Sequence, residues 1–267
     1  MDAYRLAYDG QPYHGFQRQP DVRTVEGALL GALAALGIID SGDEPPPGYA
    51  AAGRTDAGVS AVAQTVAFDA PAWLSPAALN SELPASVRAW ASAPAPEDFH
   101  ATHDAVEREY TYFLHAPDAS AARARKALAV FTGEHDFQNL TPDDTGTRRT
   151  LETALDREGP CLVVTLRAGG FPRQLVRRVV SVVASVARGE DLARVERVLE
   201  AESLPGPEGV APAPPEPLVL TGVAYPDLSF SPDAAAAERA RDLFDRLRVE
   251  RATGARVADE LAALGEE

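Results

Sequence analysis

Hydrophobic and polar residues alternate along several short stretches of the chain, a pattern that predicts strands. In residues 3–8 the side chains of Tyr4, Leu6 and Tyr8 fall on one face, and residues 108–114 repeat the pattern with two tyrosines. The same pattern predicts further strands around Val66 and Phe68 and at 49–52, 87–92, 147–154, 161–167 and 218–225.

Segments of helical periodicity separate these strands. Thr24 is a suitable N-cap for a helix that buries an apolar stripe within residues 25–36. Ser75 precedes a second helix, which has Pro76 at its first position and ends before Pro84. Other helices are expected at 119–130, at the strongly amphipathic 174–188 and from Asp233 onwards, and an exposed Pro-rich loop is expected at 205–217.

The order of these elements predicts the fold class. Both halves of the chain follow the order β-α-β-β-α-β, which is that of a split β-α-β unit. We therefore expect an α+β fold in which two RRM-like, or ferredoxin-like, halves share a mixed, mainly antiparallel sheet with a central cleft. The expected halves are 1–104 and 105–267, and the second ends in an acidic helical tail.

The composition is that of a globular protein, since 45% of the 267 residues are hydrophobic and 24% are charged. Cys161 is the only cysteine, which excludes an intrachain disulfide and a multi-cysteine zinc site. No apolar run approaches the ~18 residues that a membrane helix needs, and the N-terminus lacks the pattern of a signal peptide. These features predict a cytoplasmic protein with no membrane segment.

The formal net charge of −15 argues against a nucleic-acid partner, because a phosphate backbone repels an acidic protein. The distribution of the charges weakens that objection. Lys126 is the only lysine, so 24 of the 25 basic residues are arginines, and several of these cluster within 148–178. An alanine-rich, lysine-poor acidic surface resembles that of proteins from salt-loving organisms. The acidic pairs and runs lie in expected loops, helix ends and tails, at 40–44, 97–98, 143–144, 190–191 and 266–267.

The segment Gly53-Arg54-Thr55-Asp56-Ala57-Gly58 is the first candidate for chemistry. As an isolated pattern it is typical of a turn, since Asp and Gly are common turn formers. The alternative interpretation is that two flanking glycines let the backbone present one carboxylate into a cleft. A carboxylate aimed in this way by a neighbouring guanidinium can attack an electrophilic carbon.

Other motifs lie on both sides of this loop, in a fixed order and spacing. Together with the loop they resemble the tRNA pseudouridine synthase A family over roughly residues 4 to 226, and so many motifs in register outweigh the turn interpretation. The motifs are Tyr8-Asp9-Gly10, Tyr13-His14-Gly15-Phe16-Gln17, Thr24-Val25-Glu26-Gly27, Gln64-Thr65-Val66-Ala67-Phe68, Asp98-Phe99-His100-Ala101, Arg108-Glu109-Tyr110-Thr111-Tyr112, Gly133-Glu134-His135-Asp136-Phe137, and Gly170-Phe171 ahead of Gln174-Leu175-Val176-Arg177-Arg178.

The resemblance implies a role for particular residues. Asp56 is expected to be the nucleophile, paired with Arg177, while Tyr110 stacks on the target base and Arg54 holds the flipped nucleotide. The implied reaction is isomerisation of uridine to pseudouridine at positions 38 to 40 of the tRNA anticodon arm, by a homodimer and without a cofactor or metal. The residues expected to bind RNA are Arg18, Gln64, Arg173 and Arg178.

Some positions depart from the family pattern. Pro172 follows Phe171 where a bulky residue is usual, which puts the start of the helix carrying Arg177 in question. The leucine of the base pocket is either Leu218 or Leu220. Three aromatic residues are expected in the hydrophobic core rather than in the site: Phe68, Tyr112 and Phe171.

Two other functions fit parts of the sequence. A non-catalytic RNA-binding protein with RRM-like sheets would use exposed aromatics such as Tyr110 and Tyr112, but it leaves the aspartate loop without a task. A metal hydrolase would use His100, His103 and Glu107, which could share one face of a helix. Nearby prolines and the absence of an HExxH pattern favour a loop there instead.

Overall fold

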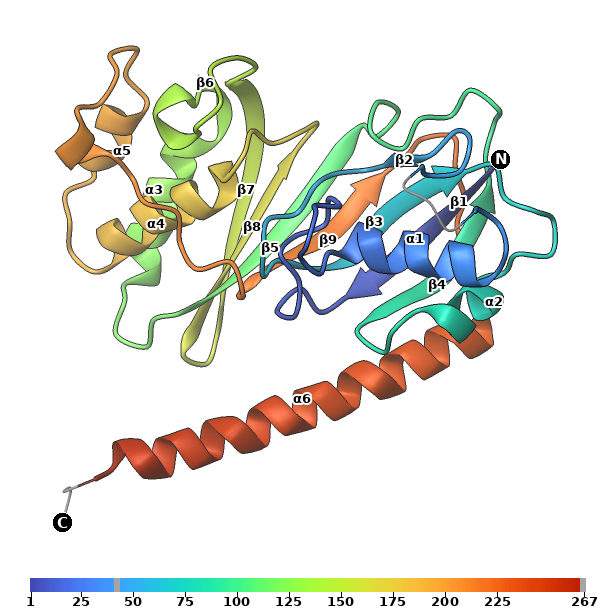
Figure 1. Cartoon of the computed structure of the whole chain (residues 1–267). Coiled ribbons are helices and arrows are strands. Elements are labelled where there is room, and N and C mark those ends of the chain that lie inside the picture. Colours follow the sequence, from blue (N-terminus) through green and yellow to red (C-terminus); the bar gives the residue numbers. More distant parts are fainter. Residues whose placement is uncertain (41–43, 265–267) are drawn as a thin grey trace.

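The computed structural model describes residues 1–40 and 44–264, so Asp43 of the acidic stretch 40–44 and the acidic pair 266–267 lie outside the described residues. Ten strands form one sheet in the order β10-β4-β1-β3-β9-β5-β8-β7-β6, with β2 paired to β3 beside this path (Figure 1). Within the described ranges, every pairing is antiparallel except that of β3 with β9. The predicted α+β fold with a mixed, mainly antiparallel sheet is confirmed.

The elements that the sequence predicts follow one another in the predicted order, and two short strands and one short α-helix are added to them. The strands are β1 (Asp2–Tyr8), β2 (Ala50–Ala51), β3 (Ser60–Phe68), β4 (Val87–Pro94), β5 (Glu107–His115), β6 (Gly133–Asp136), β7 (Arg148–Glu158), β8 (Cys161–Ala168), β9 (Leu218–Ala224) and β10 (Ser231–Pro232). The α-helices are α1 (Val25–Ala35), α2 (Pro76–Glu82), α3 (Ala121–Phe131), α4 (Leu175–Ala187), α5 (Ala193–Val198) and α6 (Ala234–Ala262).

Side-chain caps set the first turns of four helices, and the cap of α3 is Ser120, whose Oγ accepts a hydrogen bond from the N–H of Arg123 at 3.3 Å. Thr24 Oγ1 accepts a hydrogen bond from the N–H of Gly27 at 3.1 Å, and Ser75 Oγ accepts one from Ala78 at 3.1 Å. Asp233 caps α6 in the same way. These caps satisfy N–H groups that have no partner within a helix, and those of α1, α2 and α6 confirm the three predicted helix starts.

Helices α1 to α4 cover one face of the sheet, and α6 lies against the other (Figure 1). Cross-strand partners share a face, and the pairs Tyr8–Ala61, Ala61–Leu220 and Leu220–Tyr110 connect the buried face of β1 with that of β5. Strand β9 thus joins the two parts of the sheet and contributes to both hydrophobic clusters. Arg5, which alternates with the buried positions of β1, faces the groove beneath α6.

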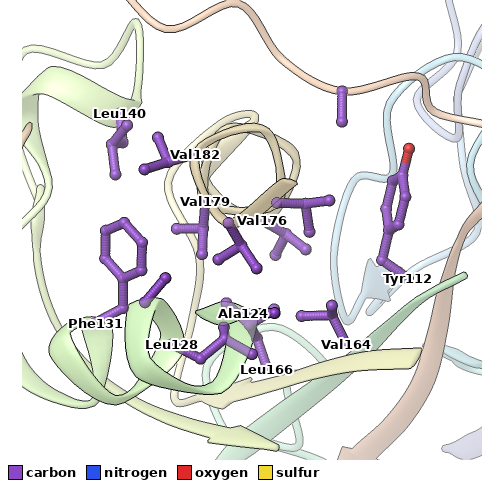
Figure 2. Close-up of a cluster of buried hydrophobic side chains, with 14 of the residues drawn as sticks. Tyr112, Ala124, Leu128, Phe131, Leu140, Val164, Leu166, Val176, Val179 and Val182 are labelled. Carbon is purple, nitrogen blue, oxygen red and sulfur yellow. The ribbon is translucent and has the colours of Figure 1, made fainter. Parts of the chain in front are cut away.

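The C-terminal cluster forms around α4, as Figure 2 shows. Val176, Val179 and Val182 of α4 pack toward Phe131 of α3 and Leu166 of β8, and all five are buried. This packing explains the amphipathic sequence of 174–188. It also holds the first turn of α4 at the centre of the molecule.

Several predictions need correction. Strands β6 and β10 and helix α5 were not predicted, because each is short and weakly patterned. The segment 205–217 is not exposed throughout, since Val210 and Ala213 are buried. Helix α6 carries as many arginines as carboxylates, so the described part of the tail is not acidic. No described helix is long and apolar enough to span a membrane.

Candidate active site

Asp56 lies on the loop between β2 and β3, at the centre of the sheet. Backbone bonds close this loop: the N–H of Val59 donates to Asp56 O at 3.1 Å, and that of Phe16 donates to Thr55 O at 3.0 Å. Gly58 has a φ of +82°, a conformation that residues with a Cβ rarely adopt. The local sequence therefore folds as a tight turn that presents the carboxylate.

Two buried side chains anchor the loop from below. Tyr8 OH lies 2.8 Å from Thr55 Oγ1, and Gln64 Nε2 donates to Gly53 O at 2.7 Å. Burial raises the pKa of the Tyr8 hydroxyl, so it remains a neutral hydrogen-bonding group. The loop is thus held at both Gly53 and Thr55, on either side of Arg54 and just ahead of Asp56.

Arg177 pairs with Asp56 across 121 residues of sequence. Its Nη1 lies 2.9 Å from Asp56 Oδ2, and its Nε donates to Ala213 O at 2.6 Å. The two paired side chains are 13% and 33% exposed, so the pair is partly shielded from solvent. Helix α4 still forms after Pro172, whose carbonyl accepts a bond from the N–H of Leu175 at 3.2 Å, but its N-cap Gln174 has a φ of +60° and no side-chain cap.

A cleft of about 540 Å³ opens above this pair. Tyr110 and Phe171 meet there with perpendicular rings whose centroids are 5.2 Å apart. Burial raises the pKa of Tyr110 to about 12, opposed by Arg108 and assisted by Asp56, so the phenol is neutral at physiological pH. The residues around the cleft include Phe16, Arg54, Asp56, Tyr110, Phe171 and Leu218.

Comparison with known proteins agrees with the sequence motifs. A family model described as tRNA pseudouridine synthase matches residues 127–226. Proteins named tRNA pseudouridine synthase A are 60% identical in Haloarcula marismortui, over 98% of this chain and 98% of that protein, and 60% identical in Natronomonas pharaonis, over 98% and 99%. The chain belongs to the tRNA pseudouridine synthase A family. Its enzyme class is therefore that of an isomerase.

A further tRNA pseudouridine synthase A, from Halobacterium salinarum, is 58% identical over 98% of both chains. Among solved structures, that of an archaeal box H/ACA sRNP Nop10-Cbf5 complex aligns with a TM-score of 0.37 and 11% identity, over 70% of this chain and 43% of that chain. A likeness this weak adds nothing to the family assignment.

The synthase residues that were expected to bind RNA occupy different environments. Arg173 is exposed at the rim of the cleft and pairs with Asp143, which also lines the cleft. Arg18 is exposed on the loop after β1. Gln64 is fully buried beneath the aspartate loop, so the expected RNA contact does not match its position. Arg178 donates to Val210 O at 2.7 Å and to the Gln174 side chain, so its guanidinium is held by contacts within the protein.

The aromatic residues differ in whether they lie in the core or line the cleft. Phe68 and Tyr112 are buried in the core, as expected. Phe171 is half-buried: it packs against the C-terminal cluster and also lines the cleft beside Tyr110. Of the two leucine candidates, Leu218 lines the cleft, whereas Leu220 does not appear among its walls.

The structure does not bring together the residues of the two alternative sites, the metal site and the RRM-like RNA-binding surface. His100 and His103 lie in a loop with ring centroids 4.1 Å apart, and His100 Nδ1 accepts backbone N–H groups. In the part of the chain that the structure describes, no three His, Cys, Asp or Glu residues are grouped to hold a metal ion. Tyr112 is buried, so it cannot serve an RRM-like surface for RNA.

Sequence reasoning missed two features of this synthase site. The Tyr8–Thr55 contact had no local signal, since the residues are 47 positions apart. The anchoring of Arg177 and Arg178 by the carbonyls of residues 210–213 was also missed, because proline-rich segments are ordinarily exposed. The available signal was the presence of the apolar residues Val210 and Ala213 within the proline-rich segment.

Proposed function

We propose that this chain isomerises uridine to pseudouridine at positions 38 to 40 in the anticodon arm of tRNA, with Asp56 as the nucleophile. The bond from N1 of uracil to the ribose breaks, the base rotates, and C5 bonds to the same ribose carbon. C5 loses a proton and N1 gains one, so the product is an isomer and needs no redox or group-transfer cofactor. The proposal covers attack by Asp56 on either the base or the ribose carbon.

The observation that supports the nucleophile most strongly is the partly buried Asp56–Arg177 pair at the floor of the cleft. A guanidinium that is fixed by Ala213 O orients one carboxylate oxygen. Nucleophiles are activated by such oriented partners within hydrogen-bonding distance. A non-catalytic RNA-binding protein has no use for this arrangement.

The cleft suits a single flipped base. Extruding a nucleotide costs a few kcal/mol, and stacking on an aromatic ring returns ~1–3 kcal/mol per base. Tyr110 provides such a ring, fixed against Phe171, and Leu218 adds an apolar wall. Arg54 is exposed at the mouth of the cleft, where its guanidinium can fill the space that the base vacates.

Phosphate contacts are proposed for the arginines at the rim. Arg18 and Arg173 are exposed, and Arg173 already has a carboxylate partner in Asp143. A tRNA phosphate offers the same bidentate acceptor geometry and can replace that carboxylate.

We further propose that the enzyme acts as a homodimer in the cytoplasm. The outer part of α6 supports the dimer, because Val257 and Leu261 are 57% and 63% exposed there, and Leu264 just beyond its end is 82% exposed. This end of the helix extends away from the body of the protein (Figure 1). Light scattering coupled to gel filtration tests this proposal, and a monomer at micromolar concentrations would contradict it.

The test of the function is chemical mapping of pseudouridine in an unmodified tRNA transcript after incubation with the purified protein. We expect pseudouridine at one or more of positions 38 to 40, and loss of the same modification in a strain without this protein. Pseudouridine only outside the anticodon arm would contradict the substrate position, and its complete absence would contradict the activity.

A further inference from the structure

Arg108 is a buried guanidinium close to the candidate active site, with 8% of its surface exposed. It lies two residues before Tyr110 on β5, so both side chains project from the same face of the sheet. An arginine has five N–H donors, and all of them have acceptors here. Nε and Nη2 donate to Ala52 O at 2.9 and 2.8 Å, Nη2 also to Thr102 O at 2.6 Å, and Nη1 to Ala105 O at 3.4 Å and to Gly169 O.

The acceptors belong to the segments that build the site. Ala52 directly precedes the loop of Asp56, and Gly169 directly precedes Gly170-Phe171. Thr102 lines the cleft, and its hydroxyl donates to Ala51 O at 2.5 Å. One side chain therefore bonds the backbone just before the loop of Asp56 and just before the segment that carries Phe171.

We infer that Arg108 is a positioning residue for the reaction, because its guanidinium fixes the loop of Asp56 relative to Tyr110 and Phe171. The inference rests on the proposed function, in which the reaction rate depends on the distance between Asp56 and the base stacked on Tyr110. All four acceptors are neutral carbonyls, and no ion pair to Arg108 occurs among the described residues.

The shape of the side chain is what this role requires. Burial lowers the pKa of Arg108 from its high usual value. A planar fork can bond three segments at once, whereas a lysine offers three donors from a single point. A buried charge without a charged partner adds little to the free energy of unfolding by itself. The role of Arg108 therefore lies in the geometry that it fixes rather than in stability.

The experiment compares Arg108→Lys with Arg88→Lys. Arg88 is a matched control because it is half-buried and donates to two carbonyls, those of Asn80 and Leu83, away from the cleft. Both variants are assayed in single turnover at saturating tRNA, together with tRNA affinity and the unfolding temperature. Since a misplacement of about 1 Å can cost ~10²-fold in rate, we expect Arg108→Lys to lose at least about 30-fold while its tRNA affinity stays within about threefold.

Arg108→Gln provides a second variant that does not depend on burying an ammonium group. It removes the charge and leaves no unpaired charge behind, since every acceptor is neutral. We expect the same rate loss, and Arg88→Lys should retain its rate even if its unfolding temperature falls.

Two results would overturn the positioning role. The first is a rate within about threefold of wild type for both Arg108 variants. The second is a rate loss that follows the fall in unfolding temperature equally in Arg88→Lys and in Arg108→Lys. Asp56→Asn is measured alongside. If it is inactive while the Arg108 variants are normal, only the positioning role fails. If Asp56→Asn keeps its activity, the proposed function itself fails.

Discussion

At the scale of single residues, the site depends on how one carboxylate is held. Arg177 bonds Asp56 Oδ2 at 2.9 Å, and Ala213 O fixes the guanidinium from its other side at 2.6 Å. Within residues 1–40 and 44–264, no hydrogen bond reaches Asp56 Oδ1. One oxygen is thus oriented and the other has no protein partner, which is the arrangement that nucleophilic attack from a fixed position requires.

Tyr110 permits a test that separates its ring from its hydroxyl. Tyr110→Phe keeps the aromatic face and the perpendicular contact with Phe171, whereas Tyr110→Leu loses both. Because stacking contributes ~1–3 kcal/mol per base, we expect the leucine variant to be at least about tenfold slower than the phenylalanine variant in single-turnover assays. Equal rates for both variants and the wild type would place Tyr110 outside the reaction.

At the scale of elements, the helices that carry caps were the most predictable parts of the fold. Thr24, Ser75 and Asp233 each determine a helix start through contacts within three residues, so the sequence alone was sufficient. Strand β6 is four residues long and pairs only with β7, and nothing in its composition distinguishes it from a loop. Short edge strands depend on their partner rather than on their own sequence.

The site was less predictable from the sequence than the capped helices were. The glycine-flanked loop indicated Asp56 from local sequence, but the Asp56–Arg177 contact spans 121 residues and came only from the family resemblance. Gln64 shows the limit of such a transfer, because a polar residue within a motif can support the backbone of the loop instead of the ligand. Phe171 was predicted as a core residue only, because nothing in the sequence distinguishes a buried aromatic from one that packs against the core and also lines a cleft.

The cluster around α4 gives an element-scale prediction. Phe131 of α3 is fully buried and packs among the residues that face α4 (Figure 2). Phe131→Ala should lower the free energy of unfolding by ~3–5 kcal/mol, since it removes a large core side chain and leaves a cavity. Phe113→Ala is the matched control, because Phe113 is 42% exposed and should cost only about 0.5 kcal/mol. Urea unfolding measures both, and similar losses would contradict the assigned core.

At the scale of the whole molecule, an enzyme with a net charge of −15 must bind a polyanion. The charges are separated, since the cleft presents Arg54 and Arg173 while many carboxylates lie on the remaining surface. We therefore expect tRNA binding to rest on stacking, shape and a few phosphate contacts rather than on a broad basic field.

This distribution predicts an unusual response to salt. Each phosphate contact adds roughly 0.7–0.9 to the slope of log affinity against log salt, so few contacts give a shallow slope. Molar KCl reduces the Debye length to ~3 Å and screens repulsion among the carboxylates, which should raise the unfolding temperature. We expect tRNA binding and activity to persist from about 0.1 to about 3 M KCl, a range that spans the screened regime. A steep loss of affinity with unchanged thermal stability would contradict this account of the acidic composition.

The most direct test of the central claim is the single-turnover rate of Asp56→Asn on unmodified tRNA. The change removes the proposed nucleophile but little contact area, so the rate of pseudouridine formation should fall by at least about 10³-fold while tRNA affinity stays within about tenfold. Glu109→Gln is the matched control, because Glu109 also pairs with an arginine, Arg167, yet lies on the opposite face of β5 from Tyr110. It should retain the wild-type rate. Appreciable pseudouridine formation by purified Asp56→Asn would show that Asp56 is not the nucleophile.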